Sequence, residues 1–385
     1  MLLEISRKNE DMKLLMIVNE DRFFLSHRKE IALAAQRAGW DVTVVCKDTG
    51  RRNEVEALGL KVLELPINPT GENPLQELRT WWFLLTLYLK NRDAVIHHVG
   101  LKNILWGGLA AKMARVHGVV NAVSGLGAIF SGNKMGLMAK GILAFMRFSN
   151  KRKRVKVIFQ NQEDKTLFLQ RGVIDESQSE FIKGSGVDLN VFKYVPEPDS
   201  ETLKVVFSAR MVREKGVIEV IKAAEILRKE YEGRIAFWLC GRLAVNVDAI
   251  SREELDARCD GKYIKWLDFQ KDMKSVLEQC HIMAFPSYYR EGVPKSLIDA
   301  CAVGRPIVTT NSIGCKDVVD DGVNGFLVPV KDSEALAKKL RILFEDKELR
   351  VRMGKAAREK AEREFSIEEV IEKHLEIYNK IWQPV

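Results

Sequence analysis

The segment from residue 285 to 300 combines residue types suited to a phosphorylated or hydroxyl-rich ligand. An apolar run is followed by a short loop that carries Glu291 and Gly292, and Pro294 is expected in the first turn of a helix. The free N–H groups of that turn and the helix dipole favour a phosphate or sugar hydroxyls. Glu291 and Asp299 can accept hydrogen bonds from hydroxyl groups, and Gly292 permits close approach of a ligand. The alternative is an ordinary strand–loop–helix turn with an acidic rim.

A second segment, residues 208–216, places two cations after another apolar run. Arg210 and Lys215 are expected at the carboxyl edge of a parallel sheet, where open α/β sheets form their crevices. Together they can hold a diphosphate and stabilise the charge of a leaving group, Arg as a bidentate fork and Lys as a point charge. Arg213 and Glu214 are expected to be surface residues of the turn without a role in binding.

The elements that must position these side chains repeat in the same order twice. Single hydrophobic cores stop growing at roughly 250–300 residues, so 385 residues predict two domains. Apolar runs of the kind that buried parallel strands require alternate with helical stretches in both halves. The runs are residues 13–18, 41–46, 61–65, 94–98, 119–123 and 155–159, then 205–208, 235–239, 263–266, 282–285, 306–309 and 325–328.

This alternation predicts an α/β fold of two Rossmann-like doubly wound domains that face each other across a cleft. Residues 194–201, with two prolines and three acids, read as a linker. We therefore expect an acceptor-binding domain in residues 1–187 and a nucleotide-binding domain in residues 188–366. A C-terminal helix in residues 367–385 is expected to pack back on the first domain.

The charge is concentrated in the first half of the chain. Residues 1–187 hold 28 Lys and Arg against 19 Asp and Glu, giving +9, whereas residues 188–385 hold 33 against 34, giving −1. Residues 94–162 contain eleven basic residues and no acidic one. Such a field attracts a polyanion, namely nucleic acid, an anionic bilayer or a diphosphate.

An apolar stretch, residues 135–148, lies inside this basic region and is followed by five cations in residues 151–156. An apolar stripe with a cationic rim, here Lys134, Lys140 and Arg147, is typical of an interfacial helix on an anionic membrane. A core helix followed by a solvated basic turn is the alternative. Nucleic acid is not expected as a partner, because no zinc, homeodomain or RNP pattern accompanies the charge.

The sequence also excludes several classes. The six cysteines form no Cys-x-x-Cys pair, which predicts free thiols in a reducing compartment. No Asp-x-Asp triplet or His/Cys cluster has metal-ligand spacing, so no metal or other cofactor is expected. No apolar run reaches the ~18 residues that a spanning helix needs. The first eleven residues are read as a polar lead-in without a secretion signal.

Taken together, the two segments resemble the retaining glycosyltransferases of the two-Rossmann-domain (GT-B) type, family 4-like. The resemblance rests on Arg-x4-Lys, on Glu-x7-acid, and on residues 304–308 and 321–326, and covers nearly the whole chain. It implies that Arg210 and Lys215 bind the donor diphosphate, and that Glu291 contacts the transferred sugar. Asp299, where the family usually has Glu, would hold the nucleotide ribose. Further donor contacts implied are Gly241, Gly292, Val293, Pro294 and Ser296.

Within that family the chain resembles bacterial transferases, such as N-acetylgalactosaminyl transferases, that extend a sugar on a polyprenyl diphosphate. Residues 24–28, 124–127 and 311–315 carry this likeness. It implies acceptor or sugar contacts by Arg28, by the Ser124, Gly125 and Gly127 loop, and by a histidine near the end of a strand. His97 and His98 are adjacent and must face opposite sides of a sheet, and the sequence does not say which would contact the sugar. A hydrogen-bonded structural histidine is the alternative.

The expected function is transfer of a hexose or N-acetylhexosamine from a UDP-sugar to an undecaprenyl-diphosphate-linked saccharide, with retention of configuration. It belongs to the assembly of surface polysaccharide such as lipopolysaccharide O-antigen, on the inner face of the cell membrane. Rival functions are transfer to a soluble acceptor, a nucleotide-sugar epimerase of the same fold, and a basic nucleic-acid-binding protein. A nicotinamide-dependent oxidoreductase is disfavoured, because no glycine lies between Asn19 and Gly39, where its Gly-x-Gly-x-x-Gly loop belongs.

Overall fold

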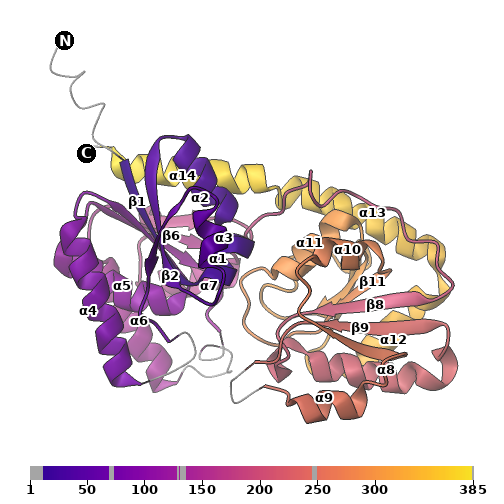
Figure 1. Ribbon diagram of the computed structural model, residues 1–385. Coiled ribbons are helices and arrows are strands. Elements are labelled where there is room, and N and C mark those ends of the chain that lie inside the picture. Colours follow the sequence, from indigo (N-terminus) through magenta and orange to yellow (C-terminus); the bar gives the residue numbers. More distant parts are fainter. Residues whose placement is uncertain (1–11, 69–72, 128–129, 131–135, 245–248, 384–385) are drawn as a thin grey trace. The chain divides into compact units, whose positions relative to one another are not determined.

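The computed structural model describes residues 12–68, 73–127, 130, 136–244 and 249–383 (Figure 1). The chain divides into two compact units: unit 1 is Met1–Ser185 with Glu368–Val385, and unit 2 is Gly186–Ile367. The sequence predictions for residues 1–11 and for Lys134 and Met135 lie outside the described residues.

Unit 1 is built on a seven-stranded parallel sheet with the order β3-β2-β1-β4-β5-β6-β7. The direction of winding reverses between β1 and β4, as in a doubly wound fold. The strands are β1 Met12–Glu20, β2 Trp40–Lys47, β3 Lys61–Glu64, β4 Val95–Val99, β5 Gly118–Val123, β6 Val155–Phe159 and β7 Ser179–Phe181.

Helices cover both faces of this sheet. They are α1 Asp21–His27, α2 Lys29–Arg37, α3 Arg52–Glu56, α4 Pro74–Lys90, α5 Leu101–Ala114, α6 Leu137–Asn150, α7 Gln162–Gln170 and the 3₁₀ turn η2 Glu176–Gln178. The last helix, α14 Ile367–Trp382, returns to unit 1. Its Ile381 packs against Gly118, where an added Cβ would lie 1.9 Å from the Ile381 Cγ2 atom.

Unit 2 has a six-stranded parallel sheet with the order β10-β9-β8-β11-β12-β13. Its strands are β8 Leu203–Ser208, β9 Ile235–Cys240, β10 Ile264–Asp268, β11 Ile282–Phe285, β12 Ile307–Thr310 and β13 Gly325–Val328. The helical elements are η3 Arg213–Lys215, α8 Val217–Tyr231, α9 Arg252–Arg258, α10 Met273–Glu278, α11 Lys295–Val303, α12 Ser333–Glu345 and α13 Lys347–Glu364.

The prediction of two doubly wound α/β sheets is confirmed, because both orders follow the 3-2-1-4-5-6 pattern. Strands β11 and β12 are buried along their whole length, as expected for a parallel sheet covered on both faces. Strand β7 was not predicted; it has three residues, is partly exposed at the sheet edge and lacks an apolar run.

Two helix starts differ from the sequence prediction by one residue. Pro294 is the N-cap of α11 rather than a residue of its first turn, since the helix begins at Lys295. Serine is a preferred N-cap, and Ser333 precedes the helical spacing of Leu336 and Leu340, so the sequence predicts a cap at Ser333. In the structure the Asp332 carboxylate accepts the hydrogen bond from the Ala335 N–H at 2.8 Å instead. Aspartate caps a helix as well as serine does, so the N-cap lies one residue earlier than predicted, while the predicted helix itself is present.

All six cysteines are free thiols. None of the described helices combines the length and the apolar composition needed to cross a bilayer.

Candidate active site

The winding of unit 2 brings two predicted segments to the same edge of its sheet. Strands β8 and β11 are hydrogen-bonded neighbours, and the order of strands reverses between them. Arg210 and Lys215 follow β8, and Glu291 follows β11. Ligands of doubly wound sheets bind outside the carboxyl ends of the strands at this reversal. The topology therefore places the three predicted catalytic residues where a nucleotide is expected.

Lys215 and Glu291 are in direct contact. The Lys215 ammonium forms an ion pair with Oε1 of Glu291, and their side chains are 15% and 10% exposed. The same carboxylate oxygen accepts a hydrogen bond from the Ser287 hydroxyl at 3.1 Å. The Lys215 ammonium also lies 4.9 Å from the centre of the Tyr289 ring, within range of a cation–π interaction. The largely buried Lys215 ammonium is thereby held beside a carboxylate that can accept hydrogen bonds from hydroxyl groups.

The backbone of Glu214 joins the two loops. Its carbonyl oxygen accepts hydrogen bonds from the Ser287 hydroxyl at 3.1 Å and from the N–H groups of Tyr288 and Tyr289 at 3.0 and 3.1 Å. Gly216 follows with φ +85°, and an added Cβ would lie 2.2 Å from the Pro286 carbonyl oxygen. The loops approach so closely that only glycine fits there.

The segment after β12 supports the loop that carries Glu291 from the other side. Gly314 has φ +82°, and a Cβ there would lie 1.8 Å from the Gly292 carbonyl oxygen and 2.8 Å from the Glu291 Cβ. The Ser312 hydroxyl donates to the Ser287 carbonyl at 2.9 Å. Residues 311–315 were noted in the sequence only for their family likeness. Their contact with Glu291, and the parts played by Ser287 and Tyr289, were missed because they depend on loops from three strands.

Arg210 is exposed on the loop after β8 and makes no side-chain hydrogen bond or ion pair within the part of the chain that the structure describes. The neighbouring Gly241 is packed behind this loop. A Cβ at Gly241 would lie 1.7 Å from the Ala209 carbonyl oxygen, and its own carbonyl accepts from the Trp266 indole N–H at 2.9 Å. Gly241 therefore lets β9 end against the Arg210 loop, while the guanidinium stays available to an anion.

The remaining predicted donor residues lie at the start of α11. Val293 and Pro294 precede the helix, and Ser296 is in its first turn. Asp299, one turn further, is buried and forms an ion pair with Lys295. Burial raises the pKa of Asp299 above its usual value, and the nearby Lys295 opposes this rise. The Asp299 carboxylate is thus already engaged by a cation of its own helix.

The two strand histidines of unit 1 are core residues on opposite faces of β4. His97 shares a 2.7 Å hydrogen bond between its Nδ1 and the Tyr378 hydroxyl of α14, whereas His98 bonds Tyr88 and Asn121 at 2.8 Å each. Both imidazoles are 0% exposed. The expectation of opposite faces agrees with this geometry. Neither ring reaches the surface.

Arg28, which the resemblance places at the acceptor, is also buried. Its side chain is enclosed at the junction of α1 and α2, and desolvation lowers its pKa to about 10. Tyr378 of α14 lies close enough to oppose this lowering of the pKa, so the C-terminal helix lies near Arg28. The loop of Ser124, Gly125 and Gly127 follows β5, and both glycines have positive φ. This loop is the predicted acceptor segment that directly follows a strand.

Acidification is expected to destabilise unit 1, because neutral imidazoles are buried there. Burial lowers the pKa of His98 to about 4 and that of His374 to about 3, and it holds the pKa of His97 well below its usual value. In the unfolded chain they titrate near 6.5, so below that pH the unfolded state binds more protons. The free energy of unfolding should fall from pH ~6.5 towards pH ~4, by up to ~1.4 kcal/mol per pH unit and imidazole.

Native-state hydrogen exchange of the β4 and β5 amides on either side of pH ~6.5 measures this slope. The variant His374→Leu removes one of the three groups and should reduce it; Arg28, His97 and Tyr378, which surround His374, remain. Equal slopes in both proteins would contradict the assignment of the effect to buried imidazoles.

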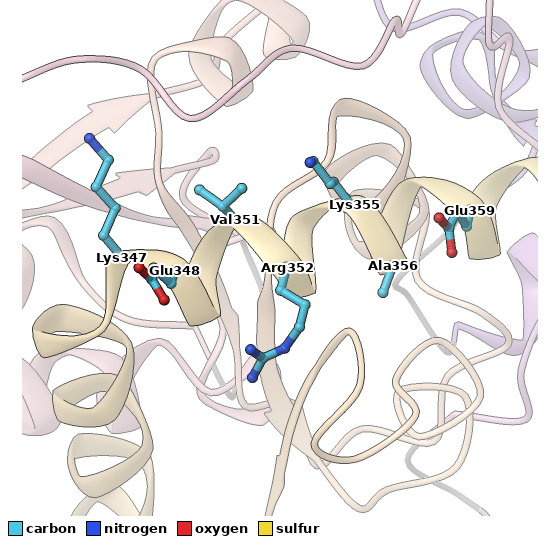
Figure 2. Close-up of a pocket in the computed structure, with 7 residues that line it drawn as sticks. All are labelled: Lys347, Glu348, Val351, Arg352, Lys355, Ala356 and Glu359. Atoms are coloured by element: carbon cyan, nitrogen blue, oxygen red, sulfur yellow. The ribbon is translucent and has the colours of Figure 1, made fainter.

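A surface hollow of about 770 Å³ lies along α13 and does not coincide with this site (Figure 2). The residues that line it are Lys347, Glu348, Val351, Arg352, Lys355, Ala356 and Glu359. They belong to one face of a single helix with mixed charge, and no predicted donor residue is among them. Within the described residues, no three His, Cys, Asp or Glu side chains are grouped as metal ligands.

Two doubly wound sheets, one with a cation–carboxylate pair at its reversal point, define the class of two-domain doubly wound α/β proteins, in which ligands bind at such reversals. Comparison with protein families assigns the chain within this class. Residues 192–360 match the family described as glycosyl transferases group 1, and residues 13–161 match the family described as glycosyl transferase 4-like. The chain belongs to the group 1, 4-like glycosyltransferases of the GT-B type, as the sequence analysis predicted.

Curated relatives cover almost the whole chain. The N,N'-diacetylbacillosaminyl-diphospho-undecaprenol alpha-1,3-N-acetylgalactosaminyltransferase of Campylobacter jejuni is 27% identical over 93% of this chain and 98% of its own. The UDP-Gal:alpha-D-GlcNAc-diphosphoundecaprenol alpha-1,3-galactosyltransferase of Escherichia coli is 22% identical over 88% and 89%.

Among solved structures, Anabaena Alr3699/HepE in complex with UDP and glucose has a TM-score of 0.76 at 19% identity, over 96% of this chain and 100% of its own. WaaG, a glycosyltransferase involved in lipopolysaccharide biosynthesis, has a TM-score of 0.73 at 14% identity, over 95% and 99%. Because these identities are low, the likeness to the solved structures supports the fold alone.

Proposed function

We propose that this glycosyltransferase moves a hexose or N-acetylhexosamine from a UDP-sugar to a saccharide linked to undecaprenyl diphosphate, with retention of the donor's configuration. The observation that carries the proposal is the Lys215–Glu291 pair at the β8/β11 reversal, with Arg210 exposed on the loop that follows β8. The two named relatives, which act on diphosphoundecaprenol-linked sugars, support the acceptor class. The HepE complex with UDP and glucose supports the donor class.

The chemistry asks little of the protein beyond charge and orientation. The bond between the sugar C1 and the β-phosphate oxygen breaks, and a bond from the acceptor hydroxyl oxygen to C1 forms on the same face. The proton of that hydroxyl passes to the departing phosphate oxygen, and UDP leaves. Arg210, Lys215 and the N–H groups at the start of α11 stabilise the negative charge that develops there. Glu291 orients the hydroxyl groups of the sugar.

We further propose that the protein acts in surface-polysaccharide assembly as a peripheral protein on the inner face of the cell membrane. In this scheme unit 2 binds the donor through residues of β8, β11 and α11, with Asp299 on the ribose, and unit 1 binds the acceptor. The Ser124–Gly127 loop is the proposed acceptor contact in unit 1. Neither a metal nor another cofactor takes part.

The test is a panel of UDP-, GDP- and ADP-sugars offered to the full-length protein with a short polyprenyl-diphosphate disaccharide. We expect UDP release only with one UDP-sugar, and a product whose new linkage NMR shows to be α. Use of a GDP- or ADP-sugar would refute the donor assignment. Equal transfer to the same disaccharide without its lipid diphosphate would refute the acceptor assignment in favour of a soluble acceptor.

A further inference from the structure

The solvent-facing side of helix α4 is apolar, the reverse of an ordinary surface helix. Leu75 is 78% exposed and Trp82 is 60% exposed, and Leu78 and Leu89 are exposed as well. With about 3.6 residues per turn, these four positions fall within an arc of about 60°. The opposite side of α4 is buried in unit 1 through Leu84, Leu85 and Tyr88. The exposed stripe therefore contributes nothing to the core.

The neighbouring helices continue this apolar surface. Of the 16 exposed large apolar side chains among the described residues, eight are on α4, α5 and α6. Helix α5 packs against both α4 and α6 (Figure 1). Leu137 of α6 is 87% exposed, and Met138 and Phe148 are exposed too. The apolar helix predicted at residues 135–148 is thus divided: Ala139, Leu143 and Met146 are core, whereas Leu137, Met138 and Phe148 face solvent.

The exposed charges on α4 and α6 are all positive. Glu77, the single acid of α4, is turned inward, where it accepts from the Trp106 indole N–H at 2.5 Å and pairs with Lys102 at 2.7 Å. Arg79 and Lys90 of α4 lie within about 60° of its apolar stripe by helical spacing. On α6 and just after it the exposed cations are Lys140, Arg147 and Lys151.

Exposed Leu and Trp side chains beside cations, without acids between them, match the interface of an anionic bilayer, where apolar groups enter the headgroup layer and cations meet lipid phosphates. We propose that the outward sides of α4 and α6, called the α4–α6 face, dock unit 1 on an anionic membrane. This rests on the proposed lipid-linked acceptor, which it would bring to the enzyme in the plane of the bilayer.

Vesicle flotation of the full-length protein tests this without donor or acceptor. We expect flotation with vesicles of phosphatidylcholine and phosphatidylglycerol in equal parts, and much less with phosphatidylcholine alone. The double variant Leu78→Ser, Trp82→Ser should lower the partition coefficient at least about tenfold, because it removes apolar area that would enter the bilayer. Both side chains are exposed, so the variant should still fold. The matched control is Ile226→Ser, an exposed apolar residue on α8 of unit 2, which should float like the unchanged protein.

Three results would overturn the inference. The first is absence of flotation by the unchanged protein, and the second is equal flotation of the double variant. The third is a dimer in sedimentation that the same substitutions abolish, since the face would then bind a second copy. Donor hydrolysis by the double variant separates this inference from the proposed function. Hydrolysis should be unchanged, and its absence in the unchanged protein would count against glycosyl transfer and not against docking.

Discussion

Replacing Arg210 with alanine is expected to lower the rate of sugar transfer at least about a hundredfold. Removing one preorganised hydrogen-bond donor to a developing anion typically costs this much. The guanidinium is exposed and makes no internal bond in the described chain, so its removal takes nothing from the fold. The free energy of unfolding should change by no more than about 0.5 kcal/mol. Initial rates of UDP release and thermal denaturation measure the two quantities.

Arg213 provides the matched control for Arg210. It is an exposed arginine three positions further on, and its partner is Glu254. Arg213→Ala removes the same chemical group from the same segment and should leave turnover unchanged. Arg210→Lys should recover only part of the activity, because lysine keeps the charge but not the bidentate fork. Full turnover by folded Arg210→Ala would end the assignment of Arg210 to the leaving group.

Much of the fold could be predicted because parallel strands covered on both faces read as uninterrupted apolar runs. Strands β6, β11 and β13 were predicted residue for residue. Strand β7 was missed because it is a short edge strand without that signal. The meeting of Lys215 and Glu291 could also be anticipated, since each follows a strand and the two strands are neighbours at the reversal.

What the sequence could not indicate depends on approaches in three dimensions. His97 and the α14 residue Tyr378 are 281 positions apart, so nothing near the strand marks its histidine as core. The burial of Arg28 could not be predicted for the same reason, because Tyr378, which lies near it, belongs to the last helix in the chain. The contact of Gly314 with Gly292 is likewise invisible in sequence, where it looks like one more turn glycine.

The Lys215–Glu291 pair has a consequence for donor binding. In the unliganded protein Glu291 neutralises the lysine that is proposed to meet the diphosphate. The substitution Glu291→Gln keeps the shape of the side chain but removes its charge, so the positive charge of Lys215 no longer has a carboxylate to balance it. The KM for the donor should therefore stay constant or fall. The kcat should fall about a hundredfold, because the carboxylate orients the sugar for attack.

Lys215→Met is expected to change the donor KM in the opposite direction. It removes the cation, so the donor KM should rise, and kcat should fall because the leaving group loses its charge partner. It also leaves the Glu291 carboxylate, which is 10% exposed, without its cation, so this variant should be the less stable of the two. Steady-state kinetics with varied donor, together with thermal denaturation, separate the two variants. A rise of the donor KM in Glu291→Gln equal to that in Lys215→Met would mean that both side chains simply bind the donor, and would refute an orienting role for Glu291.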